Sequence, residues 1–120
     1  MKESGEMYLE TILIIEKNRV NVRAVDISIE MGISKASVSR ALVRLKKENC
    51  IEIDGNGHII FTDYGRKMAE KIYERHQVLT KVIMSMGVDE ITASKDACKI
   101  EHHISDKTFN AIKDYIKNLD

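Results

Sequence analysis

The sequence predicts a mainly α-helical protein with one small β-hairpin, and three observations carry this prediction. Proline is absent from the 120 residues and glycine occurs only six times, so helices can run long without interruption. Apolar residues recur at intervals of three and four over most of the chain, which is the period of one helical face. Residues 51–61 instead combine alternating isoleucines with the turn sequence Asp-Gly-Asn-Gly.

Three helices are predicted in the N-terminal part. Residues 4–17 place their apolar groups as in an amphipathic to mostly buried helix. Residues 22–32 predict a second helix that ends with Gly32 as a C-cap, and Ser34 is a plausible N-cap of the third. The inner stripe of this third helix comprises Val38, Leu42 and Leu45. Two helices joined by a short turn with a glycine are typical of a helix-turn-helix.

The hairpin predicted over residues 51–61 follows the third helix directly. A hairpin at this position is the wing of a winged helix-turn-helix, and the combination is more specific than either part alone. The competing interpretation is two core helices followed by an inert hairpin. We therefore predict a winged helix-turn-helix DNA-binding domain over residues 1–63.

The remaining residues, 64–120, predict a helical metal-binding and dimerisation domain. Thr62 should cap a long helix that ends near Gly87, and residues 88–104 form one helix or two short ones. A last helix opens at Ser105 and carries an apolar stripe of Phe109, Ile112, Ile116 and Leu119. This stripe favours a homodimer through the C-terminal helices, and packing within the chain is the alternative explanation.

The charge of the chain is zero overall but uneven. Residues 33–50 carry five lysines and arginines against Glu48 alone, a local charge of +4. A local basic stretch on a neutral protein suits an element that contacts DNA, whereas a solvated helix face is the alternative. Small hydroxyls allow close approach, and Lys35 and Arg40 can reach guanine acceptors or phosphates. The predicted DNA contacts are Ser34, Lys35, Ser37, Ser39, Arg40 and, in the hairpin turn, Asn56.

The stretch CKIEHHIS, residues 98–105, groups side chains that suit chemistry. On a helix, Cys98, Glu101 and His102 are i, i+3 and i+4 and would share one face. The cluster could bind a metal, carry out thiol chemistry or be a coincidence on a polar face. Further donors are Met7 and Glu10 at i and i+3 of the first helix, and His76 in the long helix.

The types of donor atom limit which metal ions the cluster would bind. A set of thiolate, thioether, imidazole and carboxylate is softer than manganese prefers and suits iron(II), cobalt, nickel or zinc. Structural zinc sites usually show paired ligands such as Cys-X-X-Cys, which this chain lacks. The pattern therefore indicates an exchangeable regulatory site. Taken singly, each residue has an ordinary explanation as a core methionine, a buried cysteine, a core or surface histidine, or a solvated carboxylate.

The order of these features resembles the diphtheria toxin repressor family of metal-dependent transcriptional regulators, including its manganese transport regulator branch. The likeness covers roughly residues 5–118 and lies in the N-terminal MYLE, the helix-turn-helix and wing, the RH of the long helix, and IEHH with its upstream cysteine. It implies a winged-helix DNA-binding domain, a helical dimerisation domain and a repressor of metal-uptake genes. The SH3-like domain of larger members is not expected in this two-domain form.

The resemblance also implies the ligands. Met7, Cys98, Glu101 and His102 match the family's activating site, and methionine and cysteine at the first two are the iron-type pattern, where the manganese branch has aspartate and glutamate. Glu10 and His76 match ligands of the paired site in the manganese branch. Thr80 and Ser94 replace a glutamate and a histidine of the iron branch, which argues against a complete second site of that kind.

We therefore expect a metal-dependent DNA-binding regulator that is not an enzyme. Its corepressor should be Fe(II), with Mn(II) as the alternative and Co(II), Ni(II) or Zn(II) as substitutes in vitro. Its partners should be a double-stranded DNA operator and a second copy of the chain. Cys50 and Cys98 make no disulfide framework, and no signal peptide or membrane span is evident, so a cytoplasmic location is expected.

Two rival functions remain at this point. A winged-helix regulator could respond to a small ligand or to oxidation of Cys98 instead of to a metal. An enzyme could use Cys98 as nucleophile and His102 as base, one helical turn apart. The enzyme is disfavoured because no oxyanion-hole loop or orienting third group is evident, and because it leaves the basic helix-turn-helix unexplained.

Overall fold

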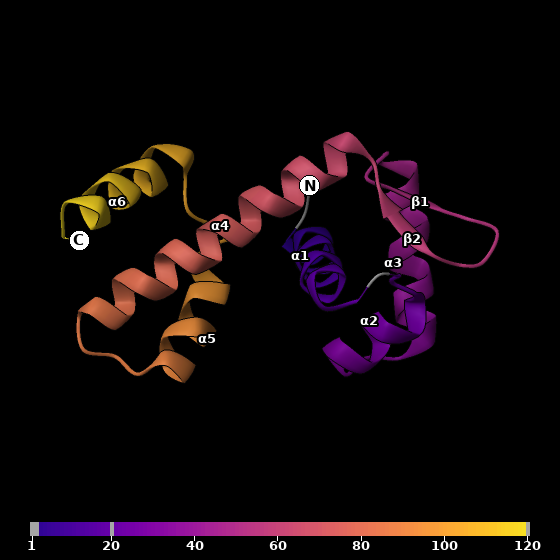
Figure 1. Cartoon of the computed structure of the whole chain (residues 1–120), viewed down its shortest axis with the longest axis horizontal. Helices are drawn as coiled ribbons and strands as arrows, with labels where there is room; N and C mark the ends of the chain where they lie inside the picture. The colour runs from indigo at the N-terminus through magenta and orange to yellow at the C-terminus, as the bar shows by residue number, and fades with distance from the viewer. Residues whose placement is uncertain (1–2, 20, 120) are drawn as a thin grey trace. The chain divides into compact units, whose positions relative to one another are not determined.

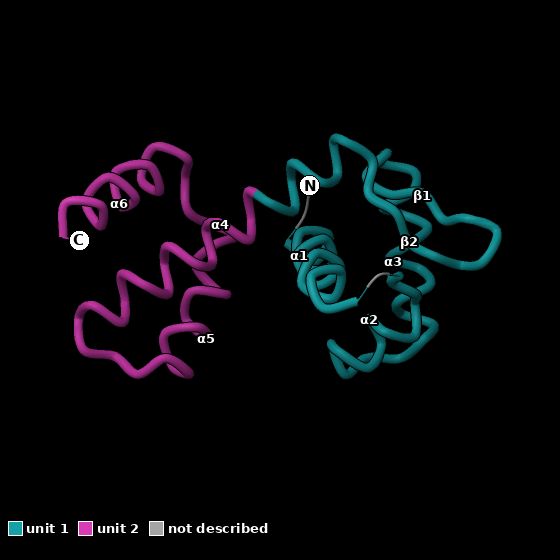
Figure 2. Tube along the Cα trace, viewed as in Figure 1, with its two compact units in different colours: residues 1–70 teal, residues 71–120 magenta. Residues whose placement is uncertain are grey.

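The computed structural model describes residues 3–19 and 21–119. Over these residues, six α-helices and a two-stranded antiparallel hairpin follow in the order α1, α2, α3, β1, β2, α4, α5, α6 (Figure 1). The mainly α-helical class with one small hairpin is thus confirmed. The chain forms two compact units, residues 1–70 and 71–120 (Figure 2), and the division falls inside α4, Asp63–Ser85. The functional boundary predicted after Asp63 stays a prediction.

Unit 1 is built on three helices, α1 (Glu3–Asn18), α2 (Ala24–Met31) and α3 (Lys35–Lys47). Gly32 ends α2 in the left-handed conformation at φ 66°, which glycine adopts without steric cost. Ser34 caps α3 by accepting a hydrogen bond from the Ser37 N–H at 3.1 Å. The helix-turn-helix is confirmed, and its core includes Leu9, Ile12, Ile27, Val38, Leu42 and Leu45.

The start of α2 differs from the prediction. Val22 was expected inside the helix, but it forms a β-bridge with Ile59, whose N–H donates to the Val22 carbonyl at 2.7 Å. Arg23 is extended, and its N–H donates to the Asp26 carboxylate at 2.9 Å, so the helix begins only at Ala24. The chain before α2 therefore pairs with the wing, a long-range contact that local periodicity does not reveal.

The wing consists of β1 (Ile51–Ile53) and β2 (Ile59–Phe61) in antiparallel register, with Ile51 opposite Phe61. Its loop is organised by Asp54, whose carboxylate accepts the N–H groups of Asn56 and His58 at 2.9 Å each. These hydrogen bonds, the His58 N–H foremost, hold the pKa of Asp54 below its usual range. The loop tip that carries Asn56 is therefore held by local hydrogen bonds.

The first turn of α4 closely approaches the segment between α3 and β1 at Gly65. Thr62 caps α4 as predicted, accepting the Gly65 N–H at 3.0 Å. A Cβ atom added to Gly65 would lie 1.9 Å from the carbonyl oxygen of Cys50. The close backbone contact with Cys50 therefore requires glycine at this position.

Unit 2 contains the rest of α4 with α5 (Glu90–Ile100) and α6 (Asp106–Leu119). Its core includes Ile72, Leu79, Ala93, Ala97, Phe109 and Ile116. Half of the predicted α6 stripe, Phe109 and Ile116, is thus buried within the chain, whereas Leu119 is 53% exposed. Packing within the chain accounts for that half, so the stripe as a whole is not a free dimerisation face.

Acid should loosen the attachment of α6 to α4. Asp106 accepts from Lys71 and Arg75, and the Lys71 ammonium above all lowers the pKa of Asp106 from its ordinary 3.8. This ion pair stabilises unit 2 fully above pH 3.8, and its contribution is lost as the pH falls through the lowered pKa. Far-UV circular dichroism from pH 7 to 2 should show a smaller acid-induced loss of helical signal in Asp106→Asn than in the wild type. Equal acid sensitivity of Asp106→Asn, the wild type and the control Asp114→Asn would contradict this.

Candidate metal centre and DNA-reading face

The predicted cluster lies where α5 ends. Cys98 is in the last turn of the helix, Glu101 is its C-cap and His102 follows in a turn. The expectation that one helix carries all three is therefore wrong beyond Ile100. Glu101 nevertheless keeps helical angles, φ −59° and ψ −26°, and its N–H donates to the Ala97 carbonyl at 2.9 Å. The three side chains consequently still gather on one side.

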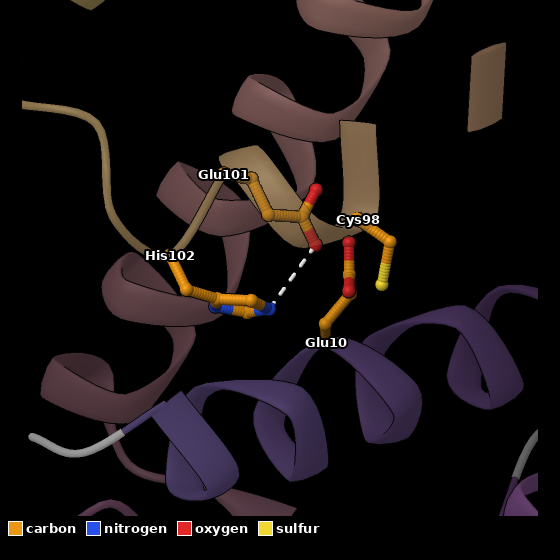
Figure 3. Close-up of side chains that lie close together, drawn as sticks. All are labelled: Glu10, Cys98, Glu101 and His102. Carbon is orange, nitrogen blue, oxygen red and sulfur yellow. Dashed lines mark ion pairs between the residues drawn. The ribbon is translucent and has the colours of Figure 1, made fainter. Parts of the chain in front are cut away.

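The donor atoms of this cluster converge (Figure 3). One ligand atom from each of Cys98, Glu101 and His102 lies within 4.8 Å of the other two. Glu101 is fully buried, and its Oε1 accepts no hydrogen bond within the described residues although His102 Nε2 lies 3.4 Å away. A buried carboxylate oxygen normally has a hydrogen-bond donor. A thiolate, a carboxylate with an oxygen that lacks a donor, and an imidazole together form a donor set that fits a divalent transition metal ion.

A buried arginine fixes the turn that carries these donors. Arg75 of α4 is 6% exposed and donates to the carbonyls of Glu101 at 3.2 Å and Ile104 at 2.6 Å, and to the Asp106 carboxylate. Its guanidinium also lies 5.4 Å from the centre of the Phe109 ring. Sequence reasoning missed this role. The signal was available, because Arg75 falls between Ile72 and Leu79 on the apolar stripe of α4.

His76 has a different environment from the other predicted ligands of unit 2. Its Nδ1 lies 2.9 Å from Glu101 Oε2 and its Nε2 lies 3.1 Å from the Ser94 hydroxyl. Within the described residues, His76 does not belong to the group of converging donors. It borders a cavity of about 400 Å³ between α4 and α5, which Thr80, Met84 and Ser94 also line.

The two remaining predicted ligands belong to unit 1. Met7 and Glu10 lie on α1, where Met7 is half-buried and Glu10 is 7% exposed. Glu10 is also labelled in Figure 3. Carboxylates are rarely so deeply buried, which sets Glu10 apart from an ordinary solvated surface charge.

The predicted DNA contacts lie on the outer side of α3 and on the wing. Lys35, Ser39, Arg40 and Asn56 are exposed, as is the capping residue Ser34. Ser37 is half-buried, and its hydroxyl accepts from the Ser34 hydroxyl at 3.0 Å and from the Arg40 guanidinium at 3.3 Å. The hydroxyl of Ser37 thus helps to orient Arg40 along the helix.

Comparisons with known proteins match the N-terminal and the C-terminal parts of the chain to two domains of the same protein family. Residues 1–59 match the model "Iron dependent repressor, N-terminal DNA binding domain", and residues 62–120 match "Iron dependent repressor, metal binding and dimerisation domain". The chain is 34% identical to the transcriptional regulator MntR of Salmonella typhimurium, over 92% of this chain and 70% of that protein. It is 29% identical to an uncharacterised helix-turn-helix regulator of Methanocaldococcus jannaschii, over 99% and 97%.

Among solved structures, the manganese regulator SloR superposes with a TM-score of 0.84 at 20% identity. The match covers 94% of this chain and 53% of SloR, so the chain spans about half the length of that structure. At this identity the likeness concerns the fold. Within the described residues, no helix combines the length and apolar character that crossing a membrane requires.

Proposed function

Because the chain belongs to the iron-dependent repressor family of metal-dependent, DNA-binding transcriptional regulators, we propose that it represses metal-uptake genes when it binds a divalent metal ion. Members of this family bind DNA operators and dimerise through the C-terminal domain, and they are regulators, not enzymes. The observation that supports the metal response in this chain is the convergence of Cys98, Glu101 and His102 at the end of α5.

We propose that Met7, Cys98, Glu101 and His102 hold the activating ion, with Glu10 as a further carboxylate donor. A bound divalent cation would supply the positive charge that offsets the negative charges of the Cys98 thiolate and the Glu101 carboxylate. Donors from α1 and from the end of α5 on one ion would restrict the movement of the DNA-reading unit. Metal and DNA would then favour the same conformer, and their coupling must be reciprocal, typically ~1–3 kcal/mol.

The donor atoms of the proposed site indicate which ion it prefers. The Cys98 sulfur, and the thioether of Met7, favour Fe(II) over Mn(II), because manganese prefers oxygen donors. The names of the relatives MntR and SloR point to manganese instead. We propose Fe(II) as the corepressor on the strength of the sulfur donors, with Mn(II) as the competing ion. Co(II), Ni(II) and Zn(II) should substitute in vitro.

We further propose that Lys35, Ser39 and Arg40 read base edges or phosphates in the major groove, with Ser34 and Ser37 at the start of the same helix. Asn56 on the wing would contact the sugar–phosphate backbone of the DNA beside that groove. A homodimer would read two half-sites about 34 Å apart or a multiple of that distance. An operator on the chromosome makes the cytoplasm the proposed place of action.

Selection of DNA from a pool of random duplexes tests this function without knowledge of the operator. The protein should enrich a two-fold symmetric sequence under anaerobic conditions with Fe(II), and anisotropy titrations should then rank Fe(II), Mn(II), Co(II) and Zn(II). A metal chelator should abolish the enrichment. Equal enrichment with and without the chelator would instead indicate a regulator that responds to a small ligand or to thiol oxidation.

A further inference from the structure

We propose that His76 is a positioning residue that orients the Glu101 carboxylate for the metal, with Ser94 fixing the imidazole ring, and that His76 is not itself a ligand. This inference rests on the proposed metal site and assigns its second layer of contacts. It also predicts one metal ion for each subunit. The argument depends on contacts within unit 2 alone.

Both ring nitrogens of His76 are already used by the protein. Glu101 Oε2 can only accept, so Nδ1 donates its proton to this oxygen across 2.9 Å. In the neutral ring Nε2 is then an acceptor, and the Ser94 hydroxyl at 3.1 Å donates to it. Ser94, His76 and Glu101 therefore form one directional chain of hydrogen bonds, which leaves neither nitrogen for a cation.

The same chain determines which oxygen of Glu101 faces the donor cluster. Oε2 is bound by His76, whereas Oε1 is buried and lies 3.4 Å from His102 Nε2. The carboxylate is thus held with one oxygen directed toward the imidazole of the cluster. Ligating carboxylates are usually held by such outer contacts, and loss of one typically costs about 10–100-fold in metal affinity.

The cavity beside His76 does not offer a second cation site. Its lining includes the hydroxyls of Thr80 and Ser94, and the Thr80 hydroxyl donates to the His76 carbonyl at 2.7 Å. The lining also contains one acidic and one basic residue, Glu90 and Lys81. The lining thus offers His76 a single carboxylate, Glu90, together with the cationic Lys81, whereas the cluster at the end of α5 groups a thiol, a carboxylate and an imidazole.

Cobalt(II) is a suitable probe because a cysteine thiolate on cobalt gives a charge-transfer absorption that reports Cys98. The full-length protein should bind one equivalent of Co(II) per subunit with this absorption. His76→Ala should lower the Co(II) affinity about 10–100-fold and retain both the absorption and the ligand-field spectrum. Ser94→Ala should lower the affinity less, and Ser94→Thr should restore it because the hydroxyl returns.

Ser85→Ala is the matched control, since the Ser85 hydroxyl donates to the Val82 carbonyl at the exposed end of α4. Co(II) binding by Ser94→Ala as tight as that of the wild type would overturn the inference, because the Ser94 hydroxyl would then have no positioning role. Tighter binding would overturn it as well, because freeing His76 Nε2 should raise the affinity only if His76 were a ligand. A second equivalent of Co(II), or a changed ligand-field spectrum in His76→Ala, would overturn it too. If His76→Ala does not fold, the two Ser94 variants decide.

Failure of the proposed metal site is distinguishable from failure of this inference. If the wild type shows no thiolate absorption, or if Cys98→Ala binds Co(II) with an unchanged spectrum, the metal site itself is wrongly assigned. If the absorption is present and depends on Cys98, but the Ser94 variants match Ser85→Ala, only the positioning role is refuted.

Discussion

Cys98→Ala should abolish the metal-stimulated increase in DNA affinity while it leaves weak, salt-sensitive DNA binding. Cys98 supplies the thiolate of the donor group at the end of α5, and its loss removes the sulfur donor on which the proposed preference for Fe(II) rests. In the wild type, metal is expected to raise the DNA affinity about 5–150-fold, which is the usual range of allosteric coupling. In Cys98→Ala the ratio of the DNA affinities with and without metal should fall to about 1. Anisotropy titrations of the selected operator with and without Fe(II) measure this ratio.

The residual binding should come from the basic stretch of α3, which the substitution does not touch. Phosphate contacts by lysine and arginine give sequence-independent affinity that falls steeply with salt. Cys98→Ala should therefore keep the salt dependence that the wild type shows in the presence of a chelator. An unchanged metal response in Cys98→Ala would refute the ligand assignment.

Cys50→Ala is the matched control for this experiment. The Cys50 side chain is fully buried in unit 1, and its thiol lies 3.8 Å from the Glu48 carbonyl. Burial, with the nearby Glu48 charge, raises the pKa of Cys50, which keeps it a neutral thiol at physiological pH and a poor metal ligand. Cys50→Ala should respond to metal as the wild type does, although some stability is lost with the buried sulfur.

Gly65→Ala should unfold or strongly destabilise the DNA-reading unit. The new methyl group would lie 1.9 Å from the Cys50 carbonyl oxygen. The oxygen belongs to the backbone and the Cβ position is fixed by the backbone of residue 65, so neither can move aside as the end of a flexible side chain can. Separating α4 from the segment between α3 and β1 would also disturb the Thr62 cap, whose hydroxyl accepts from the Gly65 N–H and donates to the Asn49 carbonyl. We expect a loss of about 3 kcal/mol or more in the free energy of unfolding, a large share of typical domain stability.

Chemical denaturation followed by circular dichroism measures this loss. Gly55→Ala is the matched control, because a Cβ there meets nothing within 4 Å. Gly65→Ala should lose DNA binding with and without metal, whereas Cys98→Ala loses only the metal response. A free energy of unfolding within about 0.5 kcal/mol of the control would show that the backbone contact is not as close as the structure places it.

The sequence by itself determined which segments become helices and where the wing lies. Helical periodicity, the caps at Ser34 and Thr62, and the left-handed end at Gly32 are local signals, because each involves residues within a few positions of one another. The grouping of Cys98, Glu101 and His102 was likewise local, since helical angles at Glu101 preserve the i, i+3 relation even though the helix ends at Ile100.

Only the tertiary structure decided what holds this cluster in place. Arg75 reaches the turn after α5, and His76 reaches Glu101, across 25 or more positions in the chain. The start of α2 and the requirement for Gly65 also depend on distant partners, Ile59 and Cys50. Periodicity and spacing describe one element at a time. Contacts between elements depend on how their faces pack, which no single stretch of the sequence specifies.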